Sequence, residues 1–251
     1  EEYGNLVWDK HFGNNYSILK KAEEQYKIPA EIIISIIGIE SKYGSRTGSF
    51  KTFDTLASLS LGPNKGRRAK FYRSELINFL LLCRENNLDP RLIRGSYAGA
   101  LGKPQFISSS YRNYAVDFNN DKKIDLWDSN ADVIGSVANY FSRHGWRYDQ
   151  PVLSSISTGN ISSLRTESKK SYKPSTRYAV YLSKGLKSIE DISEDEKLSV
   201  IVRKEQSGDV FNFAHKNFYV ITRYNRSRLY ALAVHFLSVE LREAKSQMER
   251  L

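Results

Sequence analysis

Residues 31–44, EIIISIIGIESKYG, form the stretch around which the rest of this chain is organised. Six isoleucines fall within the eight positions 32–39, directly before Glu40. A helix that is apolar on all sides lies in the interior of a protein. Pro29 suits the first turn of such a helix, and Gly44 is typical of its end. The stretch therefore predicts a buried helix with a carboxylic acid close to its last turn.

Glu40 would lie where this apolar helix meets a cleft or solvent. Desolvation at such a place disfavours the charged carboxylate and raises its pKa, which suits a general acid at neutral pH. The competing interpretation is an exposed carboxylate at a frayed helix end. It fits this stretch alone better, because perturbed carboxylates are a minority of all carboxylates.

The composition describes a folded chain without an internal disulfide. At 251 residues and 40% hydrophobic content, the chain can bury a core, as one large domain or as a domain with an insertion. No apolar run approaches the roughly 20 residues of a membrane span, and the first residues, EEYGNLVWDK, do not resemble a signal peptide. The single cysteine, Cys83, lies in the apolar segment LINFLLLCRE, which indicates a buried thiol rather than a nucleophile.

The formal net charge of +10 suggests an anionic partner. The basic residues are spread along the chain, with the densest groups within 65–70 and 169–173. They come without zinc-finger spacing or a glycine-rich phosphate loop. Nucleic acid, an anionic membrane face and an acidic cell-wall polymer would all fit.

Apolar periodicity predicts a chain that is mainly α, of the α+β class. Alternating apolar and polar residues predict a small β element in 197–205 and 210–225. Residues 149–175 are rich in Ser, Thr and Lys and are expected to form loops. Helical spacing predicts further helices at 16–27, 54–61, 67–86, 108–116, 131–143 and 226–250, and a short one from Asp89 and Pro90.

Two polar segments in the middle of the chain are candidates for binding. Residues 95–118 contain three glycines that favour close approach to a ligand, with interleaved tyrosines and Gln105 suited to sugars or bases. Residues 117–128, DFNNDKKIDLWD, have oxygen side chains at loop positions 1, 3, 5, 9 and 12, of which the first three match an EF-hand calcium loop. Lys122 replaces the glycine at position 6, and Asp128 the glutamate at position 12. Calcium and an empty Asx-rich turn are therefore both left open.

With these segments in place, the sequence resembles the membrane-bound lytic murein transglycosylase B family of bacterial cell-wall enzymes. The resemblance implies a lysozyme-like helical core, formed by 1–148 and 218–251 and including the EF-hand-like loop 117–128. It also implies a loop-rich insertion with a small β element at 149–217. Seven stretches between residues 36 and 234 carry it: IIGIESKYG, TFDTLASLS, GRRAKFYRSEL, GSYAGALGKPQF, SSSYRNYAVDFNNDKKIDLWD, IGSVANYFSRHGW and YVITRYNRSRLYALAV.

The resemblance implies cleavage of the β-1,4 bond between N-acetylmuramic acid and N-acetylglucosamine in peptidoglycan, with a 1,6-anhydromuramyl product. Glu40 would be the single catalytic acid and base, protonating the glycosidic oxygen and later accepting the proton of the muramyl 6-hydroxyl. Most glycosidases use two carboxylates, and the internal nucleophile removes that need. The alternatives are a hydrolytic muramidase, a non-catalytic peptidoglycan-binding protein and a basic nucleic-acid binder.

Other site residues follow from the resemblance position by position. Those expected to hold the substrate are Ser96, Gln105, Tyr140, Tyr224, Asn225, Tyr230, Arg67 and Arg68. Without the family, each tyrosine is better explained by core packing. The implied calcium ligands are Asp117, Asn119, Asp121, the backbone carbonyl of Lys123, and Asp132.

The resemblance also indicates partners and location. Peptidoglycan glycan strands are the expected substrate, cell-wall synthesis or division proteins are potential partners, and nucleic acid is not expected. No cofactor is expected for the chemistry, beyond a structural calcium ion if the loop binds one. The expected location is the periplasm, with membrane contact only through a lipid anchor of a full-length precursor that is not seen in this chain.

Overall fold

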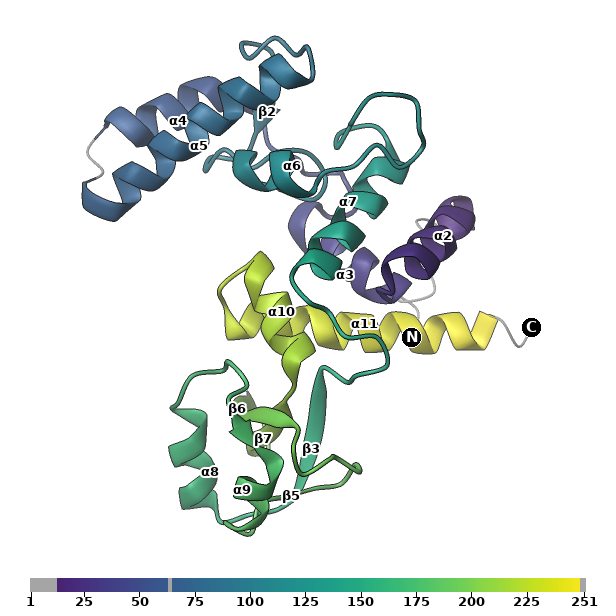
Figure 1. The fold of residues 1–251 in the computed structure, drawn as a ribbon, viewed down its shortest axis with the longest axis vertical. Helices are drawn as coiled ribbons and strands as arrows, with labels where there is room; N and C mark the ends of the chain where they lie inside the picture. Colours follow the sequence, from purple (N-terminus) through teal and green to yellow (C-terminus); the bar gives the residue numbers. More distant parts are fainter. Residues whose placement is uncertain (1–12, 63–64, 249–251) are drawn as a thin grey trace. The chain divides into compact units, whose positions relative to one another are not determined.

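The computed structural model describes residues 13–62 and 65–248 (Figure 1). The first twelve residues of the expected core and the last two residues of the predicted helix 226–250 lie outside these described residues. The chain divides into two compact units. The first comprises Glu1–Arg143 and Leu237–Leu251, and the second comprises His144–Phe236.

The first unit is helical, and α3 (Ala30–Ser41) is its buried element. Ile32, Ile33 and Ile36 are each at most 1% exposed, as the continuous apolar run predicts. Helices α2 and α7 pack against α3 and each other, and α4 and α5 form a hairpin in which α5 packs on α6 (Figure 1). The other elements of this unit are η2 (Gly13–Asn15), α2 (Tyr16–Tyr26), β1 (Phe50–Lys51), α4 (Thr52–Leu61), α5 (Gly66–Glu85), β2 (Arg94–Gly95), α6 (Ser108–Tyr114), α7 (Asn130–Arg143) and the last part of α11 (Arg228–Met248).

The C-terminal part of α11 is tied to the start of α3. The guanidinium Nε of Arg242 donates to Oε1 of the buried Glu31 over 2.6 Å. Glu31 lies in the first turn of α3, where its negative charge also complements the helix dipole.

The second unit is built on a sheet. Within the described residues the sheet has five antiparallel strands in the order β4-β6-β7-β3-β5. Phe213 and Leu198 are fully buried at the centre of its apolar cluster. The elements are β3 (Leu153–Thr158), α8 (Ile161–Ser168), β4 (Thr176–Arg177), α9 (Tyr178–Leu182), β5 (Lys187–Ser188), β6 (Lys197–Glu205), β7 (Gly208–Ala214), α10 (Lys216–Tyr224) and the first part of α11.

The second unit, His144–Phe236, is longer than the expected insertion 149–217, and hydrogen bonds of buried side chains join the added residues to the sheet. The Asn217 side chain accepts from the backbone N–H of Arg147 and donates to the carbonyls of Arg147 and Gln150, each over 2.8 Å. The hydroxyl of Ser154 lies 2.8 Å from Nε2 of His215, and both side chains are buried. The segments on either side of the sheet are therefore tied to it.

Three local predictions were wrong. No helix begins at Asp89, because its carboxylate accepts the N–H of Arg91 in a single turn, after which the chain enters β2. The expected loops of 149–175 contain β3 and α8, which Asn160 caps by accepting the N–H of Ser162. The second half of 210–225 is the helix α10 rather than strand.

The α+β class is confirmed, with a mainly helical first unit and a small sheet in the second. No helix among the described residues combines the length and apolarity needed to cross a membrane.

Candidate active site

Glu40 is the penultimate residue of α3, and its side chain is half-buried. The residues one turn before it, Ile36 and Ile37, are 0% and 7% exposed. The helix therefore carries this carboxyl from the apolar core to the edge of the unit, as the sequence predicts.

The turn after Glu40 is held by an unusual backbone. Lys42, Tyr43 and Gly44 follow one another in the left-handed region, with φ of 47°, 57° and 88°. The N–H groups of Lys42 and Tyr43 bond the carbonyls of Gly38 and Ile37, which closes the helix end. This hydrogen-bonded helix end fixes the position of Glu40, whereas a frayed end would leave it mobile.

Tyr43 folds back over the helix end. A Cβ added at Gly38 would lie 2.6 Å from Cζ of the Tyr43 ring, so only glycine leaves room for this ring. Sequence reasoning missed Tyr43, although a glycine inside an apolar helix is a signal of close packing.

The glycine-rich segment packs on the loop that follows Glu40. A Cβ at Gly48 would overlap the backbone of Gly95 and Ser96, and β1 pairs with β2 at Phe50 and Gly95. Two glycines therefore allow two backbones to touch, which is the close approach predicted for this segment.

Ser96 and Gln105 both hold this segment in shape. The Ser96 hydroxyl accepts the N–H of Ala100 over 3.0 Å. The Gln105 amide donates to the carbonyl of Gly102 over 2.8 Å and to that of Thr47 over 3.0 Å. Gln105 has a positive φ of 51°, so its backbone is strained while its side chain joins two loops. The structure thus brings Ser96 and Gln105 together with the loop after Glu40.

Tyr140 is buried behind the same segment. It is 6% exposed, and its ring centroid lies 5.7 Å from that of Phe106 and 4.9 Å from that of Tyr114. Because Phe106 follows Gln105 directly, Tyr140 supports the backbone that presents the amide. Contact between Tyr140 and a substrate stays a prediction.

Arg67 and Arg68 lie in the first turn of α5, and both side chains are exposed. Figure 1 shows α5 beginning at the tip of the α4–α5 hairpin, away from β2. At about 1.5 Å per residue, the ten residues of α4 put this tip about 15 Å from the loop at Thr52. No ion pair joins either arginine to another residue of the described chain.

Tyr224, Asn225 and Tyr230 belong to the second unit. The two tyrosine rings are nearly parallel, at 10°, with centroids 6.5 Å apart. Asn225 is exposed at the end of α10 and accepts the N–H of Ser227 through its carbonyl. Contact between these three residues and a substrate stays a prediction.

The EF-hand-like loop takes up an oxygen-rich turn. The N–H of Asp121 is shared by Oδ1 of Asp117 and Oδ1 of Asn119, each at 3.1 Å. Lys122, at the glycine position of an EF-hand, has a φ of 70°, so the backbone makes the sharp turn despite the lysine. The hard oxygen donors at positions 1, 3 and 5 therefore fit calcium.

Asp132 is fully buried, and both of its carboxylate oxygens accept loop N–H groups, from Phe118 over 2.8 Å and from Asp125 over 2.9 Å. It orients the loop from behind, and whether it also binds a metal stays a prediction. Within the described chain, no three His, Cys, Asp or Glu side chains are grouped to hold a metal ion.

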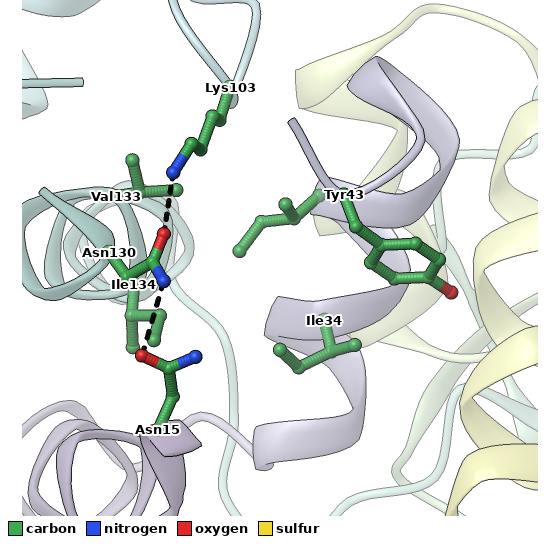
Figure 2. A pocket seen from close by; sticks show the side chains of 8 residues that line it. Asn15, Ile34, Tyr43, Lys103, Asn130, Val133 and Ile134 are labelled. Carbon is green, nitrogen blue, oxygen red and sulfur yellow. Dashed lines mark hydrogen bonds between the residues drawn. The ribbon is translucent and has the colours of Figure 1, made fainter. Parts of the chain in front are cut away.

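A cavity of about 120 Å³ lies between α3 and α7 and contains none of the predicted site residues. Figure 2 shows Ile34 and Tyr43 on one side of it. On the other side, Lys103 donates to Asn130 over 2.6 Å, and Asn130 donates to Asn15 over 3.3 Å. The cavity separates packed helices and offers no acid or nucleophile.

Known proteins resemble this chain over nearly its whole length. It is 40% identical over 238 residues to the membrane-bound lytic murein transglycosylase B of Escherichia coli, which is 94% of this chain and 63% of that relative. The soluble lytic transglycosylase SltB1 of Pseudomonas aeruginosa superposes with a TM-score of 0.90 at 39% identity, covering 98% of this chain and 81% of the other. Escherichia coli Slt35, solved in complex with calcium, gives a TM-score of 0.86 at 36% identity, covering 98% and 75%.

These structural relatives support the expected lysozyme-like architecture of lytic transglycosylases. A family model described as "Transglycosylase SLT domain" matches residues 9–239. The chain belongs to the transglycosylase SLT domain family.

Proposed function

We propose that this chain is a peptidoglycan lytic transglycosylase with Glu40 as its acid and base. The observation that carries the proposal is the position of Glu40, at the closed end of a buried helix and next to a loop tied by Gln105. A single carboxyl on a fixed support can serve both proton transfers if the nucleophile belongs to the substrate.

The chemistry needs two proton transfers through one carboxyl group. The Glu40 carboxyl donates its proton to the oxygen between the two sugars, the bond from that oxygen to C1 of N-acetylmuramic acid breaks, and positive charge develops at C1. The sugar's own acetamido oxygen can stabilise that charge. The Glu40 carboxylate then removes the proton of the 6-hydroxyl as its oxygen bonds to C1, which forms the 1,6-anhydro ring and restores the acid.

The other predicted residues would bind the glycan strand and orient it. Ser96 and Gln105 would present polar groups beside Glu40, with Tyr140 supporting them. Tyr224 and Tyr230 offer aromatic rings for stacking against sugar faces. Arg67 and Arg68, with planar guanidinium groups, suit the carboxylates of peptide or lactyl groups. The exposed amide of Asn225 would hydrogen-bond the sugars.

Relatives support the substrate class. Pseudomonas aeruginosa SltB3, 27% identical, was solved in complex with NAG-NAM-pentapeptide and with NAG-anhNAM-pentapeptide. We propose that peptidoglycan is the substrate of this chain and that the periplasm is its location. Attachment to a membrane, which the name of the Escherichia coli relative states for that protein, is proposed only through an anchor outside the residues described.

Calcium is proposed as a structural ion of the EF-hand-like loop. Asp117, Asn119, Asp121 and the carbonyl of Lys123 would hold it, with Asp132 as a further ligand or as the residue that orients the loop. The ion would stabilise the loop where it contacts the glycine-rich segment, because the backbone N–H of Lys103 donates to the carbonyl of Leu126 in the loop over 2.8 Å. It takes no part in the proton transfers.

The proposal is tested by incubating purified sacculi with the wild-type chain and with Glu40→Gln. Release of soluble muropeptides by the wild type alone supports it. Glu24→Gln, an exposed change on α2, is the matched control and should cleave like the wild type. Equal release by Glu40→Gln would reject Glu40 as the acid, and binding without release by any form would favour a non-catalytic wall-binding protein.

A further inference from the structure

The second unit contains a cavity that the proposed reaction does not use. Its volume is about 700 Å³, within the range of ligand sites. Its floor is the sheet, through Val202 of β6 and Phe211 of β7, and its wall is the end of α8 with the segment after it. The lining residues are Arg165, Ser168, Lys169, Lys170, Ser171, Tyr172, Val202, Asp209, Phe211 and Arg228.

Positive charge dominates this lining. Arg165 is paired with Asp209 over 3.0 Å, and Lys170 with Glu167 over 2.9 Å. Glu167 is also neutralised by Lys184, over 2.7 Å, so the acids nearby are already satisfied.

Two further cations on the cavity are not balanced by an acid. The Lys169 side chain makes no ion pair within the described part of the chain, and the Arg228 guanidinium donates only to the carbonyl of Ser168, over 3.5 Å. Arg228 comes from α11 and Lys169 from the basic group 169–173, so the fold brings together cations from distant parts of the sequence. Their field favours an anion.

The rest of the lining narrows the class of anion. Val202 and Phe211 give an apolar floor, and Tyr172 adds an aromatic wall. These apolar and aromatic groups suit a ligand with hydrophobic side chains better than a uniformly charged, phosphate-rich polymer such as nucleic acid. A short peptide with free carboxylates and methyl side chains matches these features, with the Arg228 guanidinium suited to a carboxylate.

We propose that this cavity binds the peptide stems of peptidoglycan through their carboxylates, with Lys169 and Arg228 as the main contacts. This inference rests on the proposed function, because it takes its ligand from the same polymer. This cavity would hold the wall by its peptides while Glu40 acts on its glycan.

The test is calorimetric titration of the full chain with the free stem tetrapeptide, which has no glycosidic bond and is not consumed. We expect saturable binding that is at least about tenfold weaker in the double variant Lys169→Gln/Arg228→Gln and that weakens with added salt. Lys187→Gln, an exposed change on β5 of the same unit, should bind as the wild type does.

Two ligand comparisons keep the test decisive even if the double variant folds poorly. On the wild type, the tetrapeptide with amidated carboxylates should bind weakly, and inorganic phosphate should not compete at equal concentration. Absence of tetrapeptide binding, equal competition by phosphate, or loss of binding in Arg67→Gln/Arg68→Gln but not in the double variant would each overturn the inference. Sacculus cleavage without tetrapeptide binding would reject this site alone, whereas binding without cleavage would reject the proposed reaction.

Discussion

The side-chain amide of Gln105 donates a hydrogen bond of 3.0 Å to the backbone carbonyl of Thr47. This bond joins the glycine-rich segment to the loop that follows Glu40, across 58 residues of sequence. The residue that the family resemblance places beside the catalytic acid therefore also fixes the backbone that leads away from that acid.

Replacing Gln105 by alanine should reduce activity more than stability. Alanine keeps the strained positive φ, so the change isolates the loss of the two amide hydrogen bonds. Each such bond contributes about 1 kcal/mol to stability, whereas a misplacement of about 1 Å at a catalytic group can cost about 100-fold in rate. We expect a 10- to 100-fold slower release of muropeptides from sacculi, with a loss of about 2 kcal/mol or less in urea unfolding. Asn113→Ala, which removes an exposed amide on α6, should change neither, and equal effects of the two variants would contradict this role.

The C-terminal part of α11 should stabilise the helix that carries Glu40. Arg242→Ala removes the guanidinium that bonds the buried Glu31 and leaves that carboxylate without its cation. We expect a loss of about 1–2 kcal/mol in unfolding free energy, at the low end of buried pairs because the Arg242 side chain is itself more than half exposed. Urea unfolding of the full chain measures it. Arg91→Ala, which breaks an exposed pair with Asp89, should unfold like the wild type, and a similar loss in both variants would count against a special role for Arg242.

Stability should fall in mild acid because of His215. Burial lowers the pKa of this imidazole to about 4, and Glu190 opposes the effect only in part. The usual value is about 6.5, so between these two values the unfolded chain takes up a proton that the native chain refuses. Stability is therefore highest above pH 6.5 and is lost as the pH falls towards 4, by at most about 3 kcal/mol from this group.

Unfolding of the wild type and of His215→Gln at pH 7 and at pH 4.5 measures this contribution. The glutamine amide reaches the position of Nε2, so it can still bond the hydroxyl of Ser154, but it does not titrate. The difference in stability between the two proteins should shrink at the lower pH. Parallel loss of stability in both would assign the acid sensitivity to other groups.

Calcium should raise the thermal midpoint by binding the native loop. Lys122→Gly should increase that rise, because it removes a positive charge beside the ion. It also relieves the left-handed φ of 70° at this position, which stabilises the native chain equally with and without calcium. Asn87→Gly relieves a similar φ of 52° outside the loop and should not change the response to calcium. The measurement is a thermal melt with calcium and with a chelator. Identical midpoints in both conditions for the wild type and for Lys122→Gly would argue for an empty Asx-rich turn.

The central helix could be predicted from the sequence because its signal is local. A run of isoleucines can only be buried, and the acid after it must reach the edge of the core. The end of α3 at Ser41, three residues before Gly44, could not be predicted, because Lys42 and Tyr43 adopt left-handed conformations that the packing of Tyr43 on Gly38 makes possible.

Elements that are stabilised by partners far away in the sequence could not be predicted from the sequence alone. Strands β1 and β2 have two residues each and exist only because they pair across 43 to 45 positions. Strand β3 lies in a Ser- and Thr-rich segment with little alternation of apolar and polar residues. A polar residue, Ser154, occupies a buried position of the strand, where it bonds His215. Only the partners of these segments reveal them.

In the candidate site, too, contacts between distant residues could not be predicted from the sequence. The resemblance predicts that Ser96 and Gln105 bind the substrate; the structure brings both to the loop after Glu40, and their contact with a substrate stays a prediction. Tyr140 is buried because its ring packs against the rings of Phe106 and Tyr114. The helical spacing of α7 does not reveal these two contacts.

The proposed reaction is tested most sharply by mass spectrometry of the soluble products that the wild-type chain and Glu40→Gln release from purified sacculi. We expect muropeptides ending in 1,6-anhydro-N-acetylmuramic acid from the wild type and none from Glu40→Gln. Reducing ends in place of anhydro ends would show that water attacks and would contradict the transglycosylase reaction. Anhydro products from Glu40→Gln at the wild-type rate would contradict the role of Glu40.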